Sequence, residues 1–173
     1  MPNESSNKSH FTFKHCYIRR SDLTQTRNIR IVRVIDGDTF VGIDVTNDDQ
    51  TITKDKYRLG GIDANELDPK YFKSKDKAKQ HYHMMAVKAT TYLKEILKID
   101  YEFITVHQGI DTFGRKLVFP IVNGCYLNVI MVQKGLAKVY RLKGAVYLHL
   151  KKELLEAEKS AKLSKIGIHK KFN

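Results

Sequence analysis

Four acidic side chains follow two apolar runs that have the pattern of strands. Asp36 and Asp38 come directly after the first run, and Asp63 and Glu66 follow the second. Residues two apart in a strand face one side, so the first pair could share a site with the second if the two strands are near neighbours. Clustered carboxylates repel one another unless a positive group joins them. All nearby ligands are oxygens, including the main-chain carbonyl of Ala64, and oxygen ligands suit Ca²⁺ or Mg²⁺.

Two arginines could supply the positive charge that phosphate chemistry requires. Arg58 lies in the predicted strand before Asp63, and Arg115 follows a glycine-containing turn. A guanidinium can bind two phosphate oxygens at once and can stabilise the negative charge that develops during phosphoryl transfer. A carboxylate such as Glu66 could then orient or deprotonate the attacking water. Two simpler interpretations stay open, in which the first acidic pair is an ordinary turn and each arginine serves a structural ion pair.

The composition favours a single domain with a polyanionic partner. The chain has 173 residues, and 42% of them are hydrophobic, which is enough to form a core. Its 31 Lys and Arg residues outnumber 19 Asp and Glu residues, giving a formal net charge of +12. Nucleic acid is the commonest partner of so basic a domain, and anionic membranes or heparin-like polymers are the alternatives. The two cysteines lack the spacing of a zinc site.

Neither a membrane nor a compartment is indicated by the apolar pattern. No apolar run approaches the length of a membrane-spanning helix, so no membrane partner is expected. The polar N-terminus lacks the apolar centre of a signal peptide, and an extracellular location would require a signal that had already been removed. The localisation is therefore left open, and a monomer is expected.

The predicted elements that position the acids and arginines form a small barrel. Five short strands, with a helix between the third and the fourth, fit a barrel of the oligonucleotide-binding type in a mainly β, α+β fold. We expect residues 1–27 to form a flexible polar arm and residues 28–173 to form the domain. The expected strands cover residues 29–35, 39–45, 54–62, 101–107 and 116–122. The expected helices run from a cap at Ser74 to Ile96, from 127 to 135 and from 146 to 165.

Four stretches resemble signatures of the thermonuclease (staphylococcal-nuclease-like) family. They are residues 34–39, 58–66, 111–115 and 135–139, in the family's order and near its spacing. The resemblance extends from about residue 29 to residue 169. It implies a five-stranded oligonucleotide-binding barrel with three helices.

The resemblance also implies a metal ion and a reaction. One Ca²⁺ would be bound by Asp38, Asp63 and the main-chain carbonyl of Ala64. Three catalytic residues are implied, with Arg58 and Arg115 contacting the phosphate and Glu66 activating water. The implied reaction is hydrolysis of the 5′ P–O bond in DNA and RNA, which leaves 3′-phosphate ends. The alternative is a non-catalytic nucleic-acid-binding module on the same fold.

Lysines, arginines and aromatic residues around these stretches are predicted to hold the nucleic acid. Basic grooves with interleaved aromatic rings are typical of proteins that bind single strands. The chain departs from the family pattern at Ala64, where Thr is usual, at Asn65, where Pro is frequent, and at His169, where Trp is common. Phe113 replaces a frequent Tyr and keeps the ring. The predicted nucleic-acid contacts are Lys70, Tyr71, Lys73, Phe113, Tyr140 and Arg141.

Overall fold

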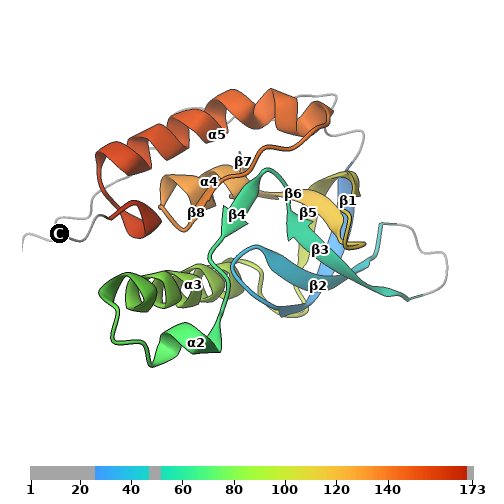
Figure 1. Ribbon diagram of the computed structural model, residues 1–173. Coiled ribbons are helices and arrows are strands. Elements are labelled where there is room, and N and C mark those ends of the chain that lie inside the picture. Colours follow the sequence, from blue (N-terminus) through green and yellow to red (C-terminus); the bar gives the residue numbers. More distant parts are fainter. Residues whose placement is uncertain (1–25, 47–51, 171–173) are drawn as a thin grey trace, which may run out of the picture.

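Five strands close into a mixed β-barrel (Figure 1). The structure is a computed structural model that describes residues 26–46 and 52–170. Neighbouring strands run antiparallel in the order β3-β2-β1-β5-β6, and a parallel pairing of β3 with β6 closes the barrel. The predicted five-stranded barrel is therefore confirmed. Its strands are β1 (Thr26–Val34), β2 (Thr39–Asp44), β3 (Lys54–Leu59), β5 (Glu102–Ile110) and β6 (Lys116–Val122).

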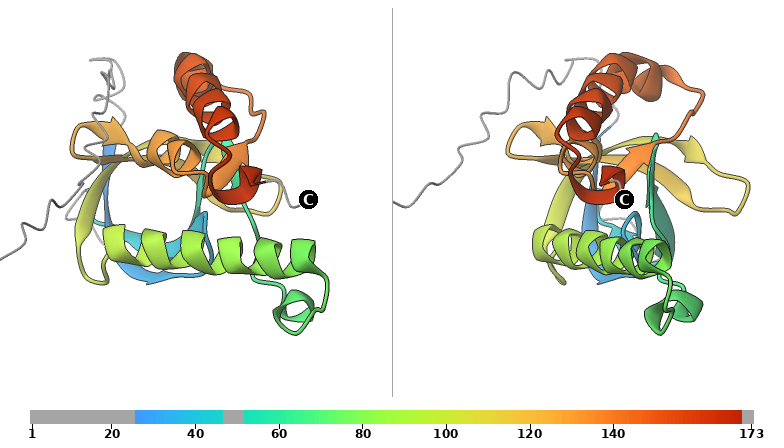
Figure 2. Two further views of the ribbon diagram at one scale, coloured as in Figure 1. Left: turned by 90° about the vertical axis from the view of Figure 1, so that its left-hand side faces the viewer. Right: turned by 60° about the vertical axis from the view of Figure 1, so that its left-hand side comes forward.

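The three predicted helices are present and lie on two sides of the barrel. Helix α3 (Lys77–Ile96) crosses one side, while α4 (Leu127–Gln133) and α5 (Ala145–Leu163) pack together on the opposite side (Figure 2). A short helix α2 (Pro69–Phe72) and a 3-10 turn η1 (Gly167–His169) are additional, and η1 contacts both α3 and α5. None of the helices in the described ranges is long and apolar enough to cross a membrane.

The cap predicted for the long helix is wrong by two residues. Asp76, not Ser74, is the N-cap of α3, and its carboxylate accepts hydrogen bonds from the main-chain N–H groups of Ala78 and Lys79. Ser74 instead accepts a hydrogen bond from the N–H of Asp76 at 3.2 Å. A carboxylate at the cap also interacts favourably with the helix dipole, which explains why Asp76 takes this position.

The predicted third strand is two strands separated by a glycine turn. Strand β3 ends at Leu59, and β4 (Ile62–Ala64) leaves the barrel to pair with β8 (Ala137–Val139). Gly61 between them has φ +71°, a conformation that favours glycine. Because of this turn, Arg58 lies in the barrel strand β3, whereas Asp63 lies in the separate two-stranded ribbon of β4 and β8.

A buried side-chain amide supports the closure of the barrel. The fully buried Asn128 of α4 donates from Nδ2 to the carbonyl of Gly60 at 2.7 Å, and more weakly to that of Val118 at 3.4 Å. The N–H of Gly60 also donates to Val118 at 2.9 Å. Because a buried carbonyl without a partner costs stability, these bonds help to hold β3 beside β6. That pairing places Arg58 and Arg115 near each other.

Small residues allow the turn after β1 to pack against α3 and β4. A Cβ added to Gly37 would lie 2.7 Å from Cβ of Ala89 and 2.8 Å from Cβ of Ala64, which is too close for any side chain. The turn that carries Asp38 is therefore held against both elements. Residues 1–25 of the predicted arm lie outside the described residues, and Thr26 and Arg27 are the first residues of β1.

Candidate active site

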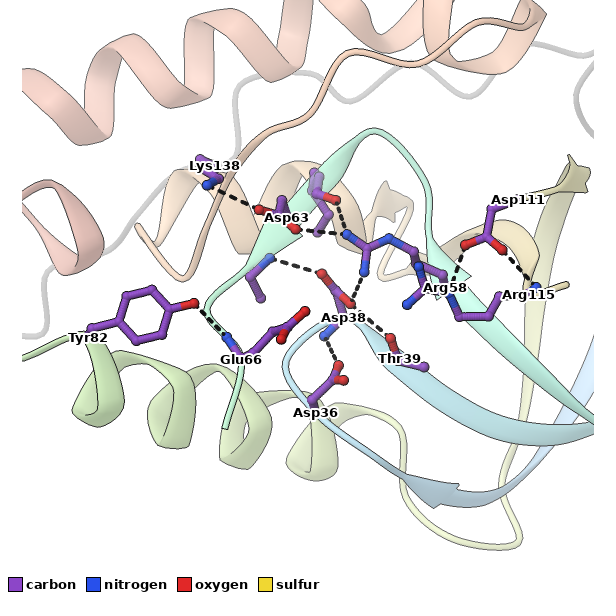
Figure 3. Close-up of polar contacts among 12 residues, drawn as sticks. Asp36, Asp38, Thr39, Arg58, Asp63, Glu66, Tyr82, Asp111, Arg115 and Lys138 are labelled. Atoms are coloured by element: carbon purple, nitrogen blue, oxygen red, sulfur yellow. Dashed lines mark hydrogen bonds and ion pairs between the residues drawn. The ribbon is translucent and has the colours of Figure 1, made fainter. Parts of the chain in front are cut away.

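Arg58 bridges the two acidic groups that the sequence places on separate strands. Its Nη1 donates to Oδ1 of Asp38 at 2.7 Å, and its Nη2 donates to Oδ1 of Asp63 at 2.9 Å (Figure 3). Thr39 lies directly opposite Arg58 in the β2–β3 pair, which brings Asp38 beside the guanidinium. Both carboxylates are therefore within hydrogen-bonding distance of one cation.

Asp38 is a buried carboxylate that accepts hydrogen bonds on both of its oxygens. Only 3% of the residue is exposed. Its Oδ1 also accepts from the hydroxyl of Thr39 at 2.9 Å, and its Oδ2 accepts from the N–H of Ala64 at 2.9 Å. Burial raises the pKa of Asp38 to about 6, although Arg58 and the N–H of Ala64 act to lower it. The surroundings thus stabilise the charged carboxylate incompletely, and a further positive charge would fit there.

Asp36 belongs to the turn itself. Its Oδ1 accepts a hydrogen bond from the N–H of Asp38 at 3.0 Å, as Asp side chains often do two residues ahead in turns. These residues therefore form a turn, and the turn presents Asp38 rather than both acids to Arg58. The negative charge of Asp36 also raises the pKa of Asp38.

Asp63 has a second cationic partner that the sequence analysis missed. Lys138 lies opposite Asp63 in the β4–β8 ribbon, and its Nζ is 3.1 Å from Oδ2 of Asp63. Lys138 falls within the stretch 135–139, but only the pairing register of the ribbon reveals its partner.

Arg115 is held in place by the turn that precedes it. Its Nε donates to Oδ2 of Asp111 at 2.7 Å, and its own N–H and that of Phe113 donate to Oδ1 at 2.9 Å each. Burial acts to raise the pKa of Asp111, but these hydrogen bonds outweigh it and lower the pKa. The guanidinium also lies 5.3 Å from the centroid of the Phe113 ring. Asp111 binds Arg115 through Nε, so the two terminal amino groups remain available for a ligand.

One cavity of about 250 Å³ joins most of these groups, but Asp38 and Ala64 are buried behind Arg58 and Asp63 and do not line it. Arg58, Asp63, Glu66 and Arg115 line it together. Glu66 is exposed, and its main-chain N–H donates to the hydroxyl of Tyr82 on α3 at 3.2 Å. The loop is thus attached to α3 while the carboxylate of Glu66 borders the cavity.

Only part of the predicted nucleic-acid set borders this cavity. Phe113 and Tyr140 line it and are 81% and 54% exposed, so both rings could stack on bases. Tyr71 instead packs edge-to-face on Tyr82, with the ring centroids 5.3 Å apart. The remaining members are exposed but do not line the cavity: Lys70, Lys73 and Arg141.

The carboxylates of Asp38 and Asp63 are the oxygen ligands that a hard cation would require, and both contact Arg58. Across residues 26–46 and 52–170, no group of three or more His, Cys, Asp or Glu side chains is arranged to hold a metal ion. The expected site requires only Asp38 and Asp63, with the main-chain carbonyl of Ala64 and water completing the shell. Two carboxylates with neutral oxygen ligands are suitable for Ca²⁺ or Mg²⁺.

The closed barrel, with its paired acids, two arginines and exposed rings beside one cavity, is typical of nuclease-like and nucleic-acid-binding domains. A comparison with family models defines this class further. The chain belongs to the staphylococcal nuclease homologue family, whose model matches residues 56–171. The matched part contains three of the four stretches, and the stretch 34–39 with Asp38 precedes it. A comparison with curated proteins found no match.

Proposed function

We propose that this chain is a Ca²⁺-dependent nuclease that hydrolyses phosphodiester bonds in DNA and RNA and leaves 3′-phosphate ends. One observation carries the proposal, namely that Arg58 joins the buried Asp38 to Asp63, and that Arg58 and Asp63 line one cavity with Arg115 and Glu66. Family membership supports it, because the fold is nuclease-like or nucleic-acid-binding. A structural ion pair alone would not require a second arginine and a carboxylate at the same cavity.

The two arginines are proposed to bind the scissile phosphate. Arg115 offers its terminal amino groups while Asp111 holds Nε, and Arg58 lines the same cavity. Guanidinium donors are most effective when they are already in place as charge develops on the phosphate oxygens. Ca²⁺ bound at Asp38 and Asp63 would supply additional positive charge for the same oxygens.

Glu66 is proposed to accept the proton of the attacking water. Its carboxylate is exposed at the edge of the cavity, where a water could lie between it and the phosphate. The water oxygen forms a bond to phosphorus, the bond from phosphorus to the 5′ oxygen breaks, and that oxygen takes up a proton from solvent. A positioned general base contributes typically about 10²- to 10⁴-fold to the rate.

Cleavage of denatured DNA tests this proposal. With Ca²⁺ present, the protein should cut the DNA into products that a polymerase extends only after a phosphatase has removed the 3′-phosphate. A chelator should abolish the cutting, and denatured RNA should be cut under the same conditions. Retarded but intact DNA with and without Ca²⁺ would instead identify a non-catalytic binding module.

Asp111 should act as a positioning residue for Arg115. Asp111→Asn keeps the size of the side chain but removes the charge-assisted hydrogen bond to Nε, which we expect to lower kcat/KM for single-stranded DNA by about tenfold to a hundredfold. Asp55→Asn is a matched control. Asp55 forms a comparable ion pair with Lys116, with Oδ2 and Nζ 2.6 Å apart, and neither residue lines the cavity. Equal losses in the two variants would remove Asp111 from this role.

A further inference from the structure

A basic groove lies beside the candidate active site, between α3, α5 and η1. Its volume is about 460 Å³. Three lysines line it, Lys138, Lys162 and Lys170, against one carboxylate, that of Glu158. The histidines of α3 and η1, His81 and His169, also line it. The groove therefore has the charge of a surface that binds a polyanion.

The carboxylate of Glu158 in this groove accepts hydrogen bonds from within the protein. Oε1 of Glu158 accepts the N–H of Val139 at 2.9 Å, and Oε2 accepts from Nζ of Lys162 at 2.7 Å. Burial acts to raise the pKa of Glu158, but the hydrogen bonds from Lys162 and Val139 outweigh burial and lower the pKa. Glu158 thus secures the end of β8 to α5 and offsets the charge of Lys162, so the positive charge that exceeds Glu158 in the groove comes from Lys138, which also contacts Asp63, and from Lys170.

The groove adjoins the catalytic cavity through two residues. Lys138 lines the groove and also forms the ion pair with Asp63, and Asn65, which follows Ala64 in the chain, lines the groove too. Figure 3 shows Lys138 and Tyr82 on one side of the acidic cluster and Arg115 on the other. A strand that lies across Arg115 and the cluster would therefore reach the groove next.

We propose that this groove is a second phosphate-binding subsite for the nucleic-acid strand that leaves the catalytic cavity. The inference rests on the proposed nuclease function and extends it to substrate length. Lys162 and Lys170 would contact phosphates of the strand, and Lys138 would lie between the two sites. Contacts of this kind add affinity without reading bases. The groove should therefore raise the affinity for long strands of any sequence and leave the affinity for very short substrates unchanged.

Paired lysine variants test the subsite. In Lys162→Gln/Lys170→Gln, KM for a long single-stranded oligonucleotide should rise about tenfold, because each lost phosphate contact weakens binding. In chelator, the dependence of log affinity on log salt should become shallower by about 1.4 for two contacts, at about 0.7 per phosphate. Turnover of a dinucleotide, which is too short to reach the groove, should change by less than about twofold.

The control pair is Lys151→Gln/Lys152→Gln, on the same helix but outside the groove. Equal increases in KM for the two pairs, or an equal loss on the dinucleotide, would overturn the subsite. A wild-type protein that cleaves neither substrate would refute the nuclease proposal instead. The binding measurements in chelator would then still decide whether the groove holds the strand, because they need no cleavage.

Discussion

Glu66→Gln should slow the cleavage of denatured DNA by about 10²- to 10⁴-fold while nucleotide affinity changes only a few-fold. The amide cannot accept the proton of the attacking water, but it keeps the size of the side chain. Because Glu66 is exposed, the free energy of unfolding should change by no more than about 0.5 kcal/mol. Single-turnover kinetics with Ca²⁺, together with binding measured in chelator, would separate the two effects.

The control for Glu66 is Glu95→Gln, another exposed glutamate that does not line the cavity. It should cleave at the wild-type rate. A Glu66 variant that also retains wild-type turnover would show that another group, or water alone, accepts the proton.

Arg58→Ala should affect both cleavage and stability. Loss of a positioned donor at the developing phosphate charge lowers kcat by about 10²- to 10³-fold. The substitution also leaves Asp38 buried without its cationic partner, and breaking a buried ion pair costs about 3–5 kcal/mol of unfolding free energy. Chemical denaturation in chelator at neutral pH would measure this loss. Arg30→Ala, which removes an exposed ion pair with Glu102, should cost at most about 1 kcal/mol.

The stability loss in Arg58→Ala should depend on pH. Burial raises the pKa of Asp38 from 3.8 to about 6 even with Arg58 present, so the ionisation of Asp38 lowers the stability of the folded protein increasingly between these two pH values. Without Arg58 this pKa rises further, so the loss should increase as the pH rises above 6 and become constant once the pH exceeds the pKa of Asp38 in the variant. As the pH falls below 6, Asp38 becomes protonated in the folded state and the loss should shrink. A loss that grows toward pH 5 would contradict this account.

Sequence patterns predict the barrel well because its strands are β-branched runs bounded by polar turns. The break at Gly60 and Gly61 is harder to predict, since a glycine pair inside an apolar run can end a strand or continue it. Here the strand ends because β4 pairs with β8, which lies far along the chain and cannot be recognised from the local sequence. The N-cap of α3 is similarly hard to predict, because Ser74 and Asp76 lie two residues apart and both are good capping residues.

In the candidate site, too, some features can be predicted from the local sequence and others depend on tertiary pairing. The residue types predict that acids and arginines could meet, and the structure places Asp38, Arg58 and Asp63 in contact. The amide of Ala64 on Asp38 and the ion pair of Lys138 with Asp63 depend on register and tertiary pairing. Such partners leave no periodic signal in a single sequence, because the contacting residues are far apart along the chain.

The central claim is that Asp38 and Asp63 together bind one divalent ion. Calorimetric titration with Ca²⁺ tests it directly and does not require activity. The wild-type protein should bind one ion, Asp38→Asn and Asp63→Asn should each weaken the affinity by about tenfold or more, and Asp44→Asn, which lies outside the cavity, should bind as the wild type does. Calcium affinity that is undetectable in the wild type, or equal in all four proteins, would contradict the account.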